Sequence, residues 1–380
     1  MFQKNLLVFE LAQPVGQGAA RHLEPVDQVG HRQHHDLQSF IRHGTLYLSA
    51  PEAAELVRRK GLAHCLQTIA EHIEADFRRW PDFDKTARVA SHSESGVIGL
   101  MPVDDSHRYS FKYANGHPGN TRHGLSTVMA FGVLADVDTG APLLLSELTL
   151  TTALRTAAMS ALTGNGAQSE LQALAFQHMV GITELHVFDL DLAATAKLVA
   201  NLQGHGLSLT VCQRTAEAVR GADIVTTVTA DKIQATILTA EMIEPGMHLN
   251  AVGGDCPGKT ELDGTILDAA KVFVEYEPQS RVEGEIQHKP DDFQVTELWQ
   301  VLLGQKAGRD NADQVTVFDS VGFALADFSA LHFRFAAANE LGLGERTALI
   351  PQLANPKNLF GLLSRFPRDC ATQSDTPTAA

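Results

Sequence analysis

The sequence predicts an α/β protein built from two domains. Its 380 residues exceed the usual size of one domain, and 44% hydrophobic with 20% charged residues is typical of a globular chain. A β-rich stretch occupies the region from about residue 88 to residue 145, whereas strands and helices alternate from Leu162 onward. The change of pattern near Leu162 indicates where one domain gives way to the other.

Composition and charge exclude several classes of partner. The formal net charge of −15 disfavours nucleic-acid backbones and anionic membranes, and no apolar stretch approaches the ~20 residues of a membrane span. The apolar residues Leu6 to Phe9 are too few for a secretory signal. The cysteines form no C-x-x-C pair, so we expect reduced thiols and a cytoplasmic protein; they are Cys65, Cys212, Cys256 and Cys370.

Residues 1–43 differ from the rest of the chain. They contain five histidines but little apolar periodicity. Histidine-rich polar segments without paired spacing are more often disordered than metal-binding. We therefore expect a disordered extension, no metal site, and ordered structure from about Gly44.

The first ordered region begins with a strand at Thr45–Leu48, and Ser49 with Pro51 then favour a helix start. Helical periodicity is interrupted at Gly61 and continues to about Trp80. The β-rich stretch that follows offers five candidate strands, at 88–90, 97–98, 109–113, 127–137 and 142–145.

A glycine-rich segment predicts a nucleotide site. Gly164–Ser169 opens a helix that ends at Gly181, and the next strand ends in Asp189, 23 residues after Gly166. Glycines let the backbone approach a pyrophosphate at a helix N-terminus, and the acid holds a ribose hydroxyl. An acid there repels a 2′-phosphate, so NAD is favoured over NADP. Ser169 replaces the third glycine, so the prediction of a Rossmann-type domain depends on the strand–helix–strand–acid context.

The alternation continues to the end of this domain. A long apolar helix then follows Thr316–Gly322, reaches about Leu341, and is expected to return to the first domain. We predict domains at 44–157 with 318–350 (substrate binding and dimerisation) and at 158–317 (NAD binding), with a polar tail at 351–380. The further elements expected in the NAD-binding domain are helices at 192–202, 215–220 and 239–243 and strands at 207–212, 223–229, 248–252 and 271–275.

The segment Gly253–Thr260 follows the strand 248–252 and permits two interpretations. Its spelling satisfies the phosphate-binding pattern G-x-x-x-x-G-K-[ST], but Asp255 would place a negative charge in an anion cradle and Pro257 removes an amide donor. The alternative is that Asp255 transfers protons beside a bound cofactor, at the sheet edge where the glycine loop lies. A turn aspartate that bonds its own backbone remains equally compatible with the sequence.

Three cations, Arg88, Lys112 and Arg155, are candidate ligands for an anion. Taken singly, each is more often a solvated surface charge, and their spacing does not bring them together.

Four segments together resemble the ornithine cyclodeaminase/mu-crystallin family, in particular its ornithine-converting bacterial members, over about residues 44–341. The segments are Phe111–Pro118, Thr152–Ala158, Gly164–Gln168 and Asn250–Lys259. The resemblance implies a lyase that converts L-ornithine to L-proline and ammonia, with NAD taking a hydride from the substrate α-carbon and returning it to the cyclic ketimine. It also implies a role in proline biosynthesis and ornithine catabolism, and a homodimer built on the domain that does not bind NAD.

The resemblance further implies roles for individual residues. Arg88, Lys112 and Arg155 would hold the substrate α-carboxylate, with Val321 also at the substrate, and Asp255 would handle protons on the substrate amines. The implied cofactor contacts are Thr127, Ala167, Gln168, Asp189, Thr229, Ala251, Val252, Lys259 and Ser320.

Two departures from the family leave other functions open. Gly99 stands where ornithine-converting relatives often carry Glu, and only eight residues separate Arg155 from Gly164. Met159–Thr163 must then supply the first strand of the NAD-binding sheet, so we expect this strand to be truncated, its neighbours poorly paired and NAD binding weak. The alternatives are an NAD(P)H-linked ketimine reductase or amino-acid dehydrogenase, and a catalytically silent crystallin-like binding protein.

Overall fold

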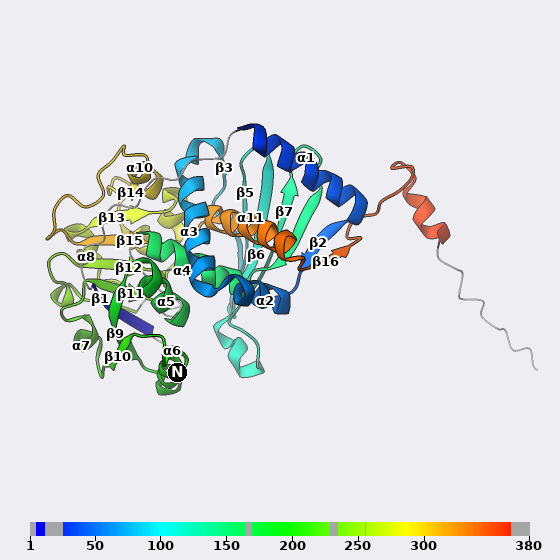
Figure 1. The fold of residues 1–380 in the computed structure, drawn as a ribbon. Helices are drawn as coiled ribbons and strands as arrows, with labels where there is room; N and C mark the ends of the chain where they lie inside the picture. The colour runs from blue at the N-terminus through cyan, green and yellow to red at the C-terminus, as the bar shows by residue number, and fades with distance from the viewer. Residues whose placement is uncertain (1–4, 12–25, 164–168, 229–234, 255, 366–380) are drawn as a thin grey trace, which may run out of the picture.

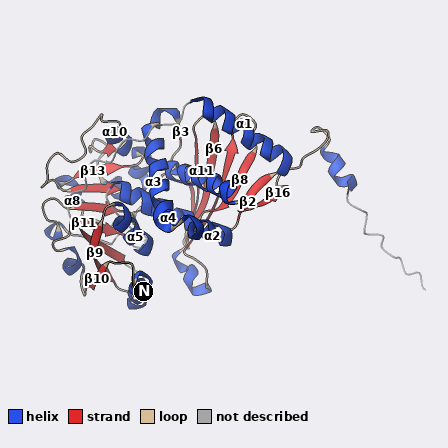
Figure 2. Ribbon diagram, in the orientation of Figure 1, coloured by secondary structure: helices blue, strands red, loops and turns tan. Residues whose placement is uncertain are grey.

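The protein folds into two α/β halves, each built around its own sheet (Figure 1). The structure is a computed structural model that describes residues 5–11, 26–163, 169–228, 235–254 and 256–365. Helices separate the two sheets and cover them, so the fold is α/β with a Rossmann-type half, as predicted (Figure 2).

The first sheet belongs to the half in which the sequence predicts a Rossmann-type domain. Its strand order is β10-β9-β1-β11-β12-β15-β13-β14, and every pair is parallel except those made by β1. β11 and β15 are buried along their whole length, because helices cover both faces of a parallel sheet. The strands are β1 (Asn5–Leu11), β9 (Ile182–Asp189), β10 (Ser208–Val211), β11 (Ile224–Thr227), β12 (His248–Ala251), β13 (Lys271–Val274), β14 (Thr296–Glu297) and β15 (Thr316–Asp319).

Most helices of this half follow its strands, as at α6. Asp191 accepts hydrogen bonds from Ala193 N and Ala194 N and thereby begins α6 directly after Asp189, which ends β9. The helices are α5 (Ser169–Met179), α6 (Leu192–Leu202), α7 (Thr215–Val219), η3 (Ala240–Met242), α8 (Gly264–Ala269), α9 (Glu277–Glu283), η4 (Glu285–His288) and α10 (Leu298–Leu302).

The second sheet has the order β16-β2-β8-β7-β6-β5-β3, with β4 paired to β5. Its central strands are antiparallel, and buried and outward residues alternate along β5. The strands are β2 (Thr45–Leu48), β3 (Asp84–Lys85), β4 (Val89–His92), β5 (Val97–Asp104), β6 (Arg108–Gly116), β7 (Val128–Asp136), β8 (Pro142–Glu147) and β16 (Glu345–Thr347).

The helix α11 (Ala324–Leu341) forms the centre of the second half. It contacts β5, β6 and β7 on one side and packs against α3 and α4, so most of its surface is buried. A helix buried all round is largely apolar, and the few polar side chains in it, such as Asp327 and Arg334, are buried as well. The other helices here are α1 (Val26–His43), α2 (Ala50–Lys60), α3 (Leu62–Arg78), η1 (Trp80–Asp82), η2 (Pro118–His123), α4 (Thr149–Thr163) and η5 (Leu359–Arg365).

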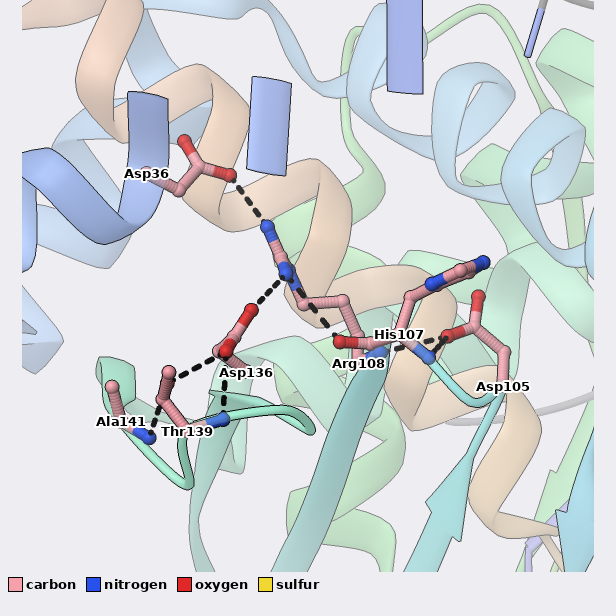
Figure 3. Close-up of polar contacts among 7 residues, drawn as sticks. All are labelled: Asp36, Asp105, His107, Arg108, Asp136, Thr139 and Ala141. Carbon is pink, nitrogen blue, oxygen red and sulfur yellow. Dashed lines mark hydrogen bonds and ion pairs between the residues drawn. The ribbon is translucent and has the colours of Figure 1, made fainter. Parts of the chain in front are cut away.

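The expectation that residues 1–43 are disordered is wrong for β1 and α1. The structure ties α1 to the second sheet through Arg108, whose guanidinium lies 2.9 Å from both Asp36 of α1 and Asp136 of β7 (Figure 3). Asp136 also accepts hydrogen bonds from the Thr139 backbone N–H and hydroxyl, which fixes the adjoining turn. The polar helix α1 is therefore held by Arg108, a buried cation from β6. The sequence alone gives no sign of this contact.

The prediction of a strand at Met159–Thr163 is also wrong. These residues continue α4, since they contain no glycine or proline that would end a helix. The place between β9 and β11 is taken instead by β1, which pairs antiparallel with both: Leu6 lies opposite Phe188 and opposite Thr227. The neighbouring strands are thus fully paired, contrary to the expectation from the short connection.

Two smaller findings concern the chain as a whole. Part of the predicted tail is ordered, since Leu359–Arg365 forms η5. Among the described residues, no helix combines the length and the apolar character needed to cross a bilayer.

Candidate active site

A cavity of about 430 Å³ lies between the two halves, a volume within the usual range for small-molecule sites. Strands β5 and β6 supply one wall through Gly99 and Lys112, and α4 supplies Arg155. The loops after β12 and β15 supply the opposite wall through Gly253 and Val321. The carboxyl ends of parallel strands therefore face the second sheet across the cavity, as is usual for ligand sites in α/β proteins.

Lys112 and Arg155 meet at one buried acid. Asp327 of α11 lies 2.6 Å from Lys112 Nζ and 3.0 Å from Arg155 Nε, and all three side chains are almost fully buried. Burial and the neighbouring Arg155 lower the pKa of Lys112 to about 7, although the Asp327 carboxylate acts in the opposite direction. The site therefore contains an amine that can gain or lose a proton near neutral pH.

Arg88 reaches the same cavity from the segment before β4. Its Nη2 donates to the Val321 carbonyl at 2.8 Å, and its Nη1 lies 3.4 Å from the Glu283 carboxylate. The side chain crosses the backbone of Gly99, where an added Cβ would lie 3.0 Å from Arg88 Cδ. Gly99 thus leaves the space that Arg88 occupies.

The structure brings together the three cations that the sequence left apart. It also identifies Asp327 and Glu283 as their partners, which sequence reasoning missed. The available signal for Asp327 was an acid placed among the apolar residues Leu325, Ala326 and Phe328, because buried acids require partners.

The predicted cofactor contacts that the structure describes divide into three groups. Thr127, Val252, Lys259 and Ser320 line the cavity, together with Val321. Ala251 is buried at the end of β12 and does not line it. Asp189 ends β9, where its Oδ1 accepts a hydrogen bond from the Asp191 N–H at 2.8 Å; Glu170 and Lys197, which were not predicted, line the cavity in this half.

Four predicted site residues lie outside the described residues: Ala167, Gln168, Thr229 and Asp255. The residues that flank two of them line the cavity, since Val228 precedes Thr229 and Gly253 and Cys256 bracket the Asp255 segment.

The cavity suits a dinucleotide. It extends from Arg155 past the ends of β11, β12 and β15 to Glu170 near the N-terminus of α5. Gly253 and Gly322 are among the residues that line it, and at Gly322 an added Cβ would lie 2.9 Å from Arg155 Nη2. Among the described residues, no group of three His, Cys, Asp or Glu side chains could hold a metal ion.

Comparison with known proteins places this geometry in context. The ornithine cyclodeaminase of Brucella suis biovar 1 (strain 1330) is 52% identical over 348 residues, covering 88% of this chain and 97% of that protein. A solved lysine cyclodeaminase, studied for its recognition of L-lysine, L-ornithine and L-2,4-diamino butyric acid, has a TM-score of 0.77 at 28% identity, covering 82% of this chain and 98% of that one.

An archaeal alanine dehydrogenase dimer with bound NAD has a TM-score of 0.73 at 29% identity, covering 80% of this chain and 99% of that one. Residues 55–340 match the family model itself. The chain therefore belongs to the ornithine cyclodeaminase/mu-crystallin family.

Proposed function

We propose that this protein is an NAD-dependent ornithine cyclodeaminase, which converts L-ornithine to L-proline and ammonia. The observation that carries the proposal is the convergence of Arg88, Lys112 and Arg155 on a cavity closed by the β12 and β15 loops. The 52% identity to an ornithine cyclodeaminase over most of both chains supports the same reaction.

The three cations would bind the substrate α-carboxylate. Two acids, Asp327 and Glu283, contact them, which leaves a positive balance for an incoming carboxylate when Lys112 is protonated. Charge-assisted hydrogen bonds to a carboxylate are stronger in a site shielded from water, and Lys112 and Arg155 are almost fully buried. Val321 would complete this end of the site, because its carbonyl already fixes Arg88.

Asp255 would move protons at the substrate amines. The residues on either side of it, Gly254 and Cys256, belong to the loop that closes the cavity opposite Lys112. The described residues Gly253 and Cys256 line the cavity, which supports this role. General acid–base groups contribute about 10²- to 10⁴-fold to rate, so Asp255→Asn should remove most turnover without loss of the fold.

NAD would occupy the part of the cavity nearer α5, and when bound it supplies reversible hydride transfer at the substrate α-carbon. Asp189 would accept a hydrogen bond from a ribose hydroxyl, while Lys259 and Ser320 would contact the cofactor near the substrate. The other residues assigned to this role are Thr127, Ala167, Gln168, Thr229, Ala251 and Val252.

We also propose a homodimer formed through the outer face of the second sheet. Leu100, Tyr113 and Phe131 lie opposite one another across β5, β6 and β7, and the rings of Tyr113 and Phe131 stack at 5.0 Å. Leu100 and Phe131 are more than 40% exposed, as is Val89 on β4. A contiguous apolar patch on a sheet face is typical of a protein interface.

The dimer has a direct test. Phe131→Glu should convert a dimer to a monomer in light scattering without changing the far-UV circular dichroism. A wild-type monomer would contradict this part of the proposal. We also propose a cytoplasmic location and a role in proline biosynthesis and ornithine catabolism.

The reaction itself can be tested with purified protein, L-ornithine and NAD⁺. Proline and ammonia should form in equal amounts without accumulation of NADH. Net NADH formation would instead indicate an amino-acid dehydrogenase, a function favoured by the similarity to alanine dehydrogenase. Neither product would indicate a catalytically silent protein.

A further inference from the structure

Three buried acids lie behind the cavity and do not line it. Asp319 ends β15, Glu285 begins η4, and Glu261 follows the loop 253–259. Each has an exposed fraction of 3% or less. Because they are far from solvent, their charges need compensation from nearby donors.

The three acids are linked by backbone N–H groups in a repeating arrangement. Asp319 accepts from the N–H of Glu285 at 2.9 Å and from the next N–H, of Ile286, at 3.2 Å. Glu285 in turn accepts from the N–H of Glu261 at 2.8 Å and from the next N–H, of Leu262, at 3.1 Å. The Asp319 carboxylate thus holds the backbone of Glu285, and the Glu285 carboxylate holds that of Glu261.

The last acid rests directly on the cavity loop. A Cβ added at Gly253 would lie 1.9 Å from Glu261 Oε1, so only glycine leaves room for this carboxylate. At the joint between the first two acids, a Cβ added at Gly284 would lie 2.3 Å from Asp319 Oδ2. The glycines at 253 and 284 therefore accommodate the acids.

The linked acids join two neighbouring segments of one cavity wall, which follow the paired strands β12 and β15. One end is the loop 253–259, which contributes Gly253, Cys256 and Lys259 to the lining. The other end is Ser320–Gly322, which follows Asp319 and lines the same cavity. A change in Asp319 or Glu285 would remove hydrogen bonds that link the two segments beyond the last strand pair, Ala251 and Asp319.

The arrangement is costly in electrostatic terms. Burial, then the nearby Asp319, raise the pKa of Glu285 well above its ordinary value, and Glu261 adds to the effect. Burial raises the pKa of Asp319 to about 7, despite the two N–H groups that stabilise its charge. Apolar side chains would be cheaper to bury at these positions, so stability alone does not account for three acids.

We propose that Asp319, Glu285 and Glu261 are positioning residues that hold the loop 253–259 in register with Ser320–Gly322 for the proposed cyclodeaminase reaction. This role rests on the function proposed above. It concerns residues that touch neither substrate nor cofactor and act only through the backbone they hold.

The central test is Glu285→Gln. The amide keeps the size of the side chain but offers one acceptor oxygen, so one of the two N–H groups of Glu261 and Leu262 loses its partner. We expect kcat per NAD-binding site to fall about 10- to 100-fold, since small misplacements of a catalytic loop have effects of this order. Alkylation of Cys256, buried in that loop, should accelerate about tenfold relative to Cys65, which is buried in the other half.

Glu52→Gln is a matched control. Glu52 also accepts from two backbone N–H groups, those of Ser49 and Gly344, but it lies in α2 away from the cavity. Its variant should leave kcat per site and the ratio of Cys256 to Cys65 alkylation unchanged. A Glu285→Gln protein that loses thermal stability while keeping both values would overturn the proposal.

Two possible complications, a variant that does not fold and a wild-type protein that is inactive, each have their own measurement. If Glu285→Gln does not fold, Gly284→Ala takes its place, because its φ of −76° suits any residue and its Cβ displaces the Asp319 carboxylate. It should give the same two changes, and wild-type values would overturn the proposal. If the wild-type protein makes no proline, the proposed function fails, but the alkylation ratio still decides whether these acids hold the loop.

Discussion

Asp327 Oδ2 lies 2.6 Å from Lys112 Nζ, and both side chains are 98% buried. The same carboxylate contacts Arg155, so a single acid from α11 holds two cations from different elements at one end of the cavity. Their separation along the chain gives no hint of this contact, which depends on how α11 packs between β6 and α4.

Asp327→Asn should destabilise the protein by about 3–5 kcal/mol, because it leaves two buried cations without their shared counter-charge. The measurement is urea unfolding at pH 7. Glu55→Gln, which removes an exposed i,i+4 partner of Arg59 on α2, should leave the transition nearly unchanged. Equal effects of the two variants would mean that the Asp327 contacts contribute no more than a surface pair.

The KM for ornithine should rise as the pH increases above 7. Burial lowers the pKa of Lys112 to about 7, so the free site loses the ammonium charge above that pH, and with it part of the attraction for a carboxylate. The Lys112→Met variant should have a higher KM that no longer changes between pH 7 and 8.5. A wild-type KM that is flat over this range would contradict the assignment of Lys112.

The same lysine should make the folded protein more stable as the pH rises, although it weakens substrate binding over that range. Between pH 7 and about 10 the unfolded chain binds a proton that the folded protein has released, so this group makes the unfolding free energy increase with pH. Comparing wild type with Lys112→Met isolates the contribution.

Val8→Pro should weaken NAD binding through the first sheet. Val8 is paired with His186 of β9 on one side and Val225 of β11 on the other, and a proline in the middle of a sheet removes a ladder hydrogen bond. Calorimetric titration with NAD⁺ gives the Kd. Val8→Ala, which keeps the backbone N–H at the same position, is the control.

A second variant tests whether Val8→Pro weakens NAD binding through β1 or through a general loss of folding. Inserting the longer connection of a relative between Leu162 and Gly164 would restore a strand from within the domain, and should make NAD binding insensitive to Val8→Pro. If Val8→Pro leaves the Kd unchanged in the original chain, β1 does not support the nucleotide site.

The role of β1 illustrates what the sequence could and could not predict. Hydrophobic periodicity placed β9 and α6 correctly, because each lies in a local pattern bounded by clear start and end signals. The apolar residues Leu6–Phe9 were judged only as a possible signal segment, since nothing local shows that a strand will pair with residues about 180 positions away. Met159–Thr163 was misassigned because the family pattern demands a strand there, whereas its own residues favour continuing α4.

Gly99→Ala should raise the KM for ornithine several-fold with a smaller change in kcat. The added Cβ would lie 3.0 Å from Arg88 Cδ and 3.2 Å from Cγ, so the arginine must shift from its contacts with Val321 and Glu283. Gly119→Ala is the matched control, because nothing lies within 4 Å of its added Cβ. Equal KM values for the two variants would show that Arg88 does not position the substrate.

The central claim is that the hydrogen removed from the substrate α-carbon returns to the same carbon. It is tested most directly with L-ornithine carrying deuterium at the α-carbon, in ordinary water with a catalytic amount of NAD⁺, and mass spectrometry of the product. We expect proline that retains the deuterium, with no net NADH. Proline that has lost the label, or a reaction that stops once the NAD⁺ has become labelled NADH, would contradict a cyclodeaminase.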